Sequence, residues 1–316
     1  MQLTTPRSNS GSSPIDAALN QASEILLGKR HQLRLAVACL LARGHLLIED
    51  LPGVGKTTLA HLLANLFGLQ FQRIQFTSDL LPADIIGATI FERETGSFTF
   101  HPGPIFSQLV LADEVNRATP KTQSALLEAM EERQVTVEGQ SRPLPMPFFV
   151  VATRNPGTQI GTFPLPESQL DRFLMRIQLG YPDRRAEHEL LRGRDRQDML
   201  AELQPAMELD HLMQVQQRVS AVHVSGALVD YVQALLDYSR RSPDYATGLS
   251  PRAGLALLRA ARAWALLDHR DAVLPEDIQA VFPSVAGHRL QAVTGTPGSK
   301  EPAAGVDALL ADVAVP

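Results

Sequence analysis

The sequence predicts an α/β protein with a mainly parallel five-stranded sheet between helices, followed by a small all-α domain. Two observations support this prediction. Between residues 45 and 179, short apolar runs alternate with helical patterns, as in sheets whose parallel strands are joined by crossover helices. After an expected linker at Tyr181-Pro182-Asp183, only helical patterning follows. The expected strands are 46–48, 71–76, 109–112, 148–152 and 174–179.

Helical spacing of apolar residues also predicts two helices before the first strand, separated at Gly28 and ending near Gly44. In the second domain we expect helices at about 184–203, 210–220, 226–241, 251–269 and 275–282. The predicted organisation is a disordered tail over 1–14, a nucleotide-binding core over 15–180, a helical domain over 181–292 and a flexible tail over 293–316.

Composition argues against several classes of protein. Lys and Arg number 29 against 34 Asp and Glu, a formal net charge of −5, and the pI is about 6.0, so a generally basic nucleic-acid surface is not expected. The single cysteine, Cys39, cannot form an internal disulfide. The longest apolar run, 35–42, is far below the roughly 18 residues of a membrane span. Because residues 1–14 lack an apolar signal segment, we expect a cytoplasmic protein.

A glycine-rich turn between the first strand and the next helix predicts a phosphate-binding loop. Its residues are Asp50-Leu51-Pro52-Gly53-Val54-Gly55-Lys56-Thr57. Glycines let backbone N–H groups converge on a triphosphate, and the N-terminus of a helix adds partial positive charge. Lys56 is expected to neutralise phosphate oxygens and Thr57 to ligate Mg²⁺. The pattern G-x-x-x-x-G-K-[ST] is met except at its first position, where Asp50 replaces glycine.

Polar residues follow two more of the expected strands, at the edge where ligands bind in parallel sheets. Asp113 and Glu114 follow 109–112, and Asn155 follows 148–152. We expect Asp113 to hold Mg²⁺ through its hydration shell and Glu114 to orient the water that attacks the γ-phosphate. Asn155 would hydrogen-bond that water and the γ-phosphate. The alternatives are a solvated acidic loop and ordinary turn chemistry at Asn-Pro.

The helix start at Ser250-Pro251 is followed at once by a cation, Arg252. A positive charge there opposes the helix dipole, so an anion is expected to approach this helix end. We therefore predict that Arg252 points at the γ-phosphate and couples nucleotide state to the angle of the helical domain. An exposed arginine with no such role is the alternative.

Together these motifs resemble an AAA+ ATPase, and more narrowly the MoxR family. The segments that carry the resemblance are 48–57, 113–118, 121–130 and 169–173, and the similarity extends over about residues 20–290. It implies a helical lid domain and ATP hydrolysis in a homo-hexameric ring, with nucleotide between subunits. Arg172 is similar in position to the family's arginine finger, although it could instead close a short helix and pair with an acid. Arg154 stands where the family is expected to have glutamine.

The resemblance also implies cofactors and partners. The cofactors would be ATP and Mg²⁺, with Thr57 and Asp113 as metal ligands. The nucleotide-binding residues are predicted to be Gly28, Pro52, Gly53, Val54, Gly55, Lys56, Thr57 and Thr58. The expected activity is to remodel, mature or activate a client protein complex in a chaperone-like way, often with a von Willebrand factor A domain partner.

Other functions stay open at this point. A metal-chelatase-type motor subunit is one alternative, and a nucleotide-gated scaffold without significant turnover is another, against which Glu114 argues. Two expected hairpins, 86–103 and 134–144, resemble insertions that line a pore or face a partner in the same branch of AAA+ proteins; surface decoration is the alternative. The mixed charge of the first hairpin argues against a ring that works on DNA.

Overall fold

A five-stranded sheet lies at the centre of the computed structural model, which describes residues 13–94, 96–156, 161–293 and 303–315. The strand order is β2-β5-β8-β1-β9, and every neighbouring pair is parallel. The predicted fold class is confirmed. The strands are β1 (Leu46–Glu49), β2 (Phe71–Gln75), β5 (Leu109–Asp113), β8 (Phe149–Arg154) and β9 (Met175–Ile177).

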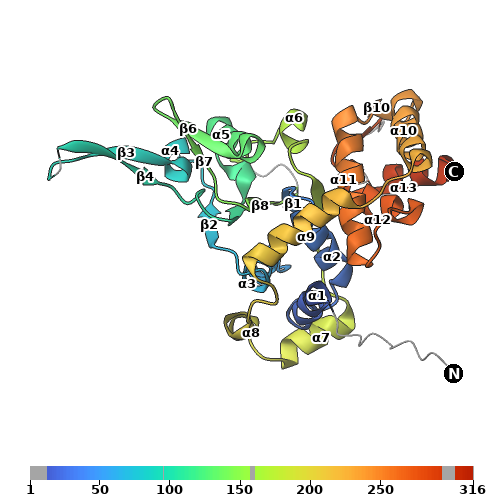
Figure 1. Cartoon of the computed structure of the whole chain (residues 1–316), viewed down its shortest axis with the longest axis horizontal. Helices are drawn as coiled ribbons and strands as arrows, with labels where there is room; N and C mark the ends of the chain where they lie inside the picture. Colours follow the sequence, from blue (N-terminus) through green and yellow to red (C-terminus); the bar gives the residue numbers. More distant parts are fainter. Residues whose placement is uncertain (1–12, 95, 157–160, 294–302, 316) are drawn as a thin grey trace, which may run out of the picture.

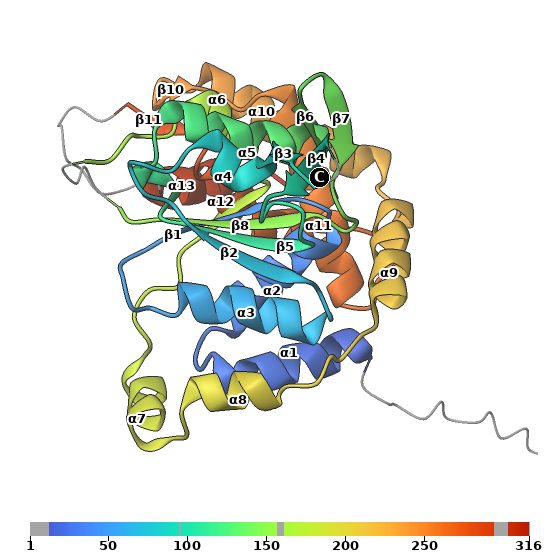
Figure 2. The same ribbon diagram turned by 90° about the vertical axis from the view of Figure 1, so that its left-hand side faces the viewer.

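Alternate residues of these strands enter two separate hydrophobic cores, as the period of a pleated strand requires. Leu46 and Ile48 face the core that contains α1, α2 and α3, whereas Leu47 faces the core beneath α5. Figure 2 shows the sheet between these two layers. The helices are α1 (Pro14–Ile25), α2 (Arg30–Leu41), α3 (Lys56–Leu66), α4 (Pro82–Ile86) and α5 (Pro120–Glu132), with short helices η1 (Val115–Arg117) and α6 (Glu167–Leu170).

Both predicted hairpins are present outside the central sheet. Strands β3 (Gly87–Glu92) and β4 (Ser97–Pro102) pair antiparallel, as do β6 (Gln134–Val137) and β7 (Gln140–Pro143). The β3–β4 hairpin extends far from the body of the protein (Figure 1). The ring centroids of Phe91 and Phe98 lie 5.2 Å apart on it, so these side chains pack on each other while remaining exposed.

A helical lid domain follows the core. It consists mainly of α9 (Leu209–Ala221), α10 (Gly226–Arg241), α11 (Pro251–Leu267) and α12 (Pro275–Ala286), with a small antiparallel pair formed by β10 (Tyr245–Thr247) and β11 (Gln291–Ala292). Helix α11 packs on both α12 and α2, so it connects the lid to the core. Helix α11 begins at the predicted Ser250-Pro251 start, where Ser250 caps the helix: its hydroxyl oxygen accepts the Ala253 N–H at 3.1 Å.

Two predictions for the C-terminal half of the chain are wrong, one about a helix and one about the terminal tail. The expected helix 184–203 is divided at Gly193 into α7 (Arg184–Arg192) and α8 (Arg196–Glu202), and α8 packs on α1 and α3 of the core rather than on the lid. The predicted C-terminal tail contains α13 (Ala303–Asp312), whose Val306 and Leu309 are buried against the lid. No helix in the described ranges combines the length and apolar content needed to cross a membrane.

One buried histidine connects the start of β1 to its surroundings. Nδ1 of His45 accepts the Val150 N–H at 3.0 Å, and Nε2 lies 3.1 Å from the Met130 carbonyl oxygen. A carbonyl only accepts, so Nε2 carries the hydrogen and the ring is neutral. Burial lowers the pKa of His45 to about 4, and Arg133 and Arg259 act in the same direction.

This burial predicts a pH-dependent stability. Between about pH 6.5 and pH 4 the unfolded chain binds a proton at His45 that the folded chain does not, so the free energy of unfolding falls as pH falls through this window, by at most about 1.4 kcal/mol per unit. Urea unfolding at pH 7, 6 and 5 measures the slope. Burial also lowers the pKa of His288, which contributes to the same slope. We therefore expect His45→Gln to reduce the slope and the exposed-site control His211→Gln to preserve it; an unchanged slope in His45→Gln would contradict this account.

Candidate nucleotide-binding site

The segment between β1 and α3 has the backbone of a phosphate-binding loop. Gly53 and Gly55 have φ values of 82° and 97°, a left-handed conformation that glycine adopts without strain. Gly55 is the residue before α3, whose first N–H groups have no carbonyl partners within the helix. Pro52 and Gly53 are exposed, whereas Val54, Thr57 and Thr58 are half-buried. The loop therefore offers backbone donors at a helix N-terminus.

Lys56 connects this loop to the end of strand β8. Its Nζ donates to the Asp50 carbonyl oxygen at 2.6 Å and to Oδ1 of Asn155 at 2.8 Å. Lys56 is only 8% exposed. Burial lowers the pKa of its ammonium, while Asp50, Asp113 and Glu114 oppose that shift. The ammonium thus lies among oxygen acceptors.

Asp113 is bound from two sides at the end of β5. Its Oδ1 accepts the hydroxyl of Thr153 at 2.6 Å, and its Oδ2 accepts Nη2 of Arg73 at 2.6 Å. Thr153 is fully buried at the end of β8, and its hydroxyl oxygen also accepts the Glu114 N–H at 2.9 Å. The two strands that flank β5, β8 and β2, therefore fix the position of this carboxylate.

Glu114 has a conformation that is uncommon for a residue with a side chain. Its φ of 56° and ψ of 47° lie in the left-handed region, where non-glycine residues are destabilised by about 1–2 kcal/mol. Its Oε1 accepts Nδ2 of Asn155 at 3.2 Å, and its Oε2 accepts Nε2 of Gln75 at 3.3 Å and pairs with Nε of Arg117 at 3.0 Å. Such strain persists only where surrounding contacts impose it.

Asp50 and Arg73 have structural roles that the sequence does not predict. Oδ2 of Asp50 accepts the N–H groups of Leu179 and Gly180, both at 2.6 Å, which joins the start of the loop to the chain after β9. Asp50 does not adopt a positive φ, so the missing glycine at this position causes no strain. Arg73 comes from β2, the edge strand beside Asp113. No local motif distinguishes either residue, because their partners are distant in sequence.

The side chain of Arg154 points away from this network. Its Nη2 donates to Oε1 of Glu49 at 2.8 Å, and Nη1 of Arg176 donates to Oε2 of the same carboxylate at 3.0 Å. Glu49 and Arg154 face each other in the register of β1 and β8. The arginine therefore forms a cross-strand ion pair next to Asn155, and Asn155 remains free to contact Lys56 and Glu114.

Three other predicted residues, Gly28, Arg172 and Arg252, are outside this hydrogen-bonded network, although the turn of Gly28 adjoins the loop, because a Cβ added to Gly55 would be 3.1 Å from Cδ1 of Leu26. Gly28 is in the turn between α1 and α2, where an added Cβ would be 3.2 Å from the Cβ of Ala186. Arg172 and Arg252 both pair with Glu131, at 2.9 Å and 3.1 Å. Within the described residues, no hydrogen bond or ion pair joins either arginine to Lys56 or its partners. Within this chain Arg252 pairs with Glu131 and Asp171, and its predicted contact with a γ-phosphate stays a prediction.

The Asp50 contacts predict a coupling between loop position and stability. In Asp50→Ala, the Leu179 and Gly180 N–H groups lose a charged acceptor, and we expect the free energy of unfolding to fall by about 2–4 kcal/mol. Urea unfolding measures this change. The exposed aspartate control, Asp79→Ala, should remain within about 0.5 kcal/mol of the original chain. Equal effects of the two substitutions would show that Asp50 does not hold the loop.

Comparison with known proteins agrees with this architecture. Residues 45–175 match the ATPase family associated with various cellular activities (AAA), and residues 238–309 match the AAA lid domain. The chain is 45% identical over 273 residues to the uncharacterized protein YeaC of Bacillus subtilis (strain 168), covering 86% of this chain and 85% of that protein.

Two further relatives are similar over most of their length. The protein named Chaperone MoxR1 of Mycobacterium tuberculosis (strain ATCC 25618 / H37Rv) is 39% identical, covering 87% of this chain and 75% of that protein. A crystal structure of a candidate ATPase from Cytophaga hutchinsonii is 35% identical, with a TM-score of 0.85 over 96% of this chain and 95% of that one. From its sheet, its lid and these relatives, the chain belongs to the MoxR family of AAA+ ATPases.

Proposed function

We propose that this protein hydrolyses ATP with Mg²⁺ at the network formed by Lys56, Asp113, Glu114 and Asn155, and that it uses the reaction to remodel, mature or activate a client protein complex. One observation carries the proposal: the start of α3 and the ends of β5 and β8 place an ammonium, two carboxylates and an amide in one hydrogen-bonded group beside a glycine-rich loop, with Thr153 connecting the two carboxylate residues. ATP turnover needs these same groups around the phosphates.

The residues fit the nucleotide and the metal in their chemistry. The N–H groups of the loop and of α3 suit phosphate oxygens, and the ammonium of Lys56 suits a β- or γ-phosphate. Mg²⁺ in such sites keeps several waters and takes few protein ligands, which agrees with one hydroxyl, Thr57, and one carboxylate, Asp113. When bound, Mg²⁺ neutralises charge on the phosphate oxygens.

The residues of the chain divide the remaining tasks. Lys56 binds phosphate oxygens. Asn155 hydrogen-bonds both Lys56 and Glu114 and so fixes the position of one side chain relative to the other. Glu114 accepts hydrogen bonds at both carboxylate oxygens and acts as the general base that orients the attacking water. Arg117 and Gln75 keep this carboxylate in place before the nucleotide arrives. The position of Glu114 favours a hydrolytic enzyme over a scaffold that only binds nucleotide.

We propose that the active assembly is a homo-hexameric ring. Arg172 and Arg252 lie together on Glu131, and their separation from Lys56 within one chain suits cations that act on the nucleotide of a neighbouring subunit. Arg172 is then the arginine finger, and Arg252 contacts the same phosphate from the lid. A finger of this kind contributes about 10³–10⁵ to turnover.

The proposed client and partner come from family membership. A relative bears the name Chaperone MoxR1, which supports a chaperone-like role here. We propose a von Willebrand factor A domain protein as partner, because the family resemblance implies one. The β3–β4 hairpin, which extends from the core with exposed Ile90, Phe91 and Phe98, is a candidate contact surface for a client (Figure 1).

Glu114→Gln tests the proposed reaction. The amide keeps the shape of the carboxylate but is a poor proton acceptor, so we expect ATP binding to persist and steady-state hydrolysis to fall by about 10²–10⁴. Phosphate release measures turnover, and calorimetry with ATP measures binding. The matched control is Glu128→Gln on the exposed side of α5.

An unchanged hydrolysis rate in Glu114→Gln would remove the residue from the proposed role.

The same assay, repeated at several concentrations of the original protein, also tests whether two neighbouring subunits share each nucleotide site. A site completed by a neighbour gives a rate per chain that rises with concentration until the ring is full. A rate per chain that is constant while light scattering reports assembly would contradict a finger acting between subunits.

A further inference from the structure

Arg73, on the edge strand β2, pairs with Asp113, the carboxylate that is expected to hold the metal. Its Nη2 donates to Oδ2 of Asp113 at 2.6 Å, and its Nε donates to the same oxygen at 3.2 Å. The hydroxyl of Thr153 donates to Oδ1 at 2.6 Å. A carboxylate has about four acceptor positions, two on each oxygen. Oδ2 is therefore fully used, and Oδ1 keeps one position.

Arg73 covers the side of Asp113 that faces solvent. Thr153, on the other side, is fully buried, so a ligand cannot reach the carboxylate past it. The side chain of Arg73 is 48% exposed, against 11% for that of Asp113. A ligand that approaches Asp113 from solvent therefore meets the guanidinium of Arg73 first.

The register of the sheet sets the position of this guanidinium. Arg73 and Gln75 are two residues apart on β2, so their side chains project from the same face of the strand. Nη2 of Arg73 also donates to Oε1 of Gln75 at 2.9 Å, and Gln75 faces Asp113 in the pairing of β2 with β5. Because Arg73 is half open to solvent, its ion pair with Asp113 is weak, and a divalent cation can replace it.

Mg²⁺ and Arg73 compete for Asp113. Mg²⁺ in phosphate sites is bound through one or two carboxylates and keeps several waters, which need acceptor positions on those carboxylates. With Arg73 in place, only one such position remains on Asp113. Two cations beside one carboxylate also repel each other. Metal binding therefore favours release of Arg73 from Oδ2.

Without a metal, the same arginine has the opposite effect on nucleotide binding. Asp113 and Glu114 belong to the hydrogen-bonded group that contains Lys56, so both carboxylates lie beside the proposed phosphate site. Carboxylates repel phosphate oxygens, and the positive charge of Arg73 offsets that of Asp113. Arg73 thus supplies, on the chain itself, part of the charge that Mg²⁺ would bring.

We propose that Arg73 is the counter-ion of Asp113 in the metal-free protein, that Mg²⁺ replaces it when a nucleotide binds, and that Arg73 thereby sets how strongly nucleotide binding depends on Mg²⁺. This inference rests on the proposed function, because it concerns the same site. Arg73 is a positioning residue here, since it acts through Asp113. It strengthens metal-free binding and reduces the gain that the metal brings.

Calorimetry with a non-hydrolysable ATP analogue tests this role. Each protein is titrated once in EDTA and once in excess Mg²⁺, and the ratio of the two dissociation constants, EDTA over Mg²⁺, measures the metal dependence. In Arg73→Gln we expect weaker binding in EDTA and binding at least as tight in Mg²⁺, so the ratio should rise by about fivefold or more. Arg241→Gln removes an exposed arginine that pairs with Asp237, and this matched control should leave the ratio unchanged.

Two further substitutions separate the charge of Arg73 from its packing. Arg73→Met keeps the apolar stem, guards against a folding defect, and should raise the ratio as Arg73→Gln does. Arg73→Lys keeps the charge and should leave the ratio close to that of the original chain. If Arg73 only braced Asp113, its loss would weaken binding in Mg²⁺ and lower the ratio. A lowered or unchanged ratio in Arg73→Gln and Arg73→Met, or an equal rise in Arg73→Lys, would overturn the proposal.

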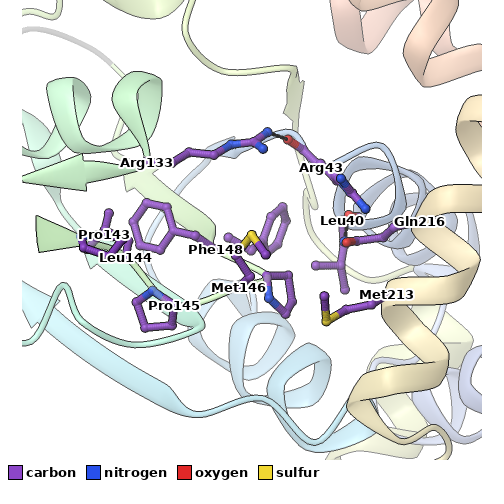
Figure 3. A pocket seen from close by; sticks show the side chains of 12 residues that line it. Leu40, Arg43, Arg133, Pro143, Leu144, Pro145, Met146, Phe148, Met213 and Gln216 are labelled. Atoms are coloured by element: carbon purple, nitrogen blue, oxygen red, sulfur yellow. Dashed lines mark hydrogen bonds between the residues drawn. The ribbon is translucent and has the colours of Figure 1, made fainter.

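Binding of the analogue elsewhere on the chain is measured with Lys56→Ala. Figure 3 shows one such place, an apolar pocket of about 440 Å³ at the start of β8 with Arg43 and Arg133 at its edge. No aspartate or glutamate is among its lining residues in the described ranges, so binding there would not depend on Mg²⁺. If the original protein binds no more analogue than Lys56→Ala does, the proposed function fails. If it binds more but the ratio ignores Arg73, only the counter-ion role fails.

Discussion

The contact on which the candidate site depends is the buried ammonium of Lys56, held by the carbonyl of Asp50 and the amide of Asn155. A charge removed from water requires such acceptors. Because Asp50 follows β1 and Asn155 follows β8, the two strands must be neighbours, and their parallel pairing provides this. The order of strands in the sheet thus determines the chemistry at its carboxyl edge.

The same constraint explains the position of the acidic pair. Strand β5 lies on the other side of β8, so Thr153 at the end of β8 can contact Asp113 and the backbone of Glu114. The strained φ of Glu114 turns its side chain toward Asn155. Each polar residue at this edge is positioned by a neighbouring strand. The left-handed backbone of Glu114 is therefore held by two contacts, one from its N–H group to Thr153 and one from its carboxylate to Asn155.

Much of this arrangement could be predicted from the sequence, and the reasons are local. A glycine-rich turn before a helix defines the loop, and the rule that ligands meet the carboxyl ends of parallel strands brings Asp113 and Asn155 to it. The position of Arg252 could not be predicted, because its partners Glu131 and Asp171 are more than 80 residues away. Likewise, α13 follows a run of turn-forming residues, and only tertiary burial of Val306 and Leu309 indicates a packed helix.

The central claim is that the Lys56 network binds the phosphates of a nucleotide, and calorimetric titration with a non-hydrolysable ATP analogue and Mg²⁺ tests it most directly. In Lys56→Ala the loop loses its buried cation, and the account predicts binding weaker by about a hundredfold or more. The exposed-lysine control, Lys121→Ala, should bind as the original chain does. Undiminished affinity in a folded Lys56→Ala protein would contradict the account.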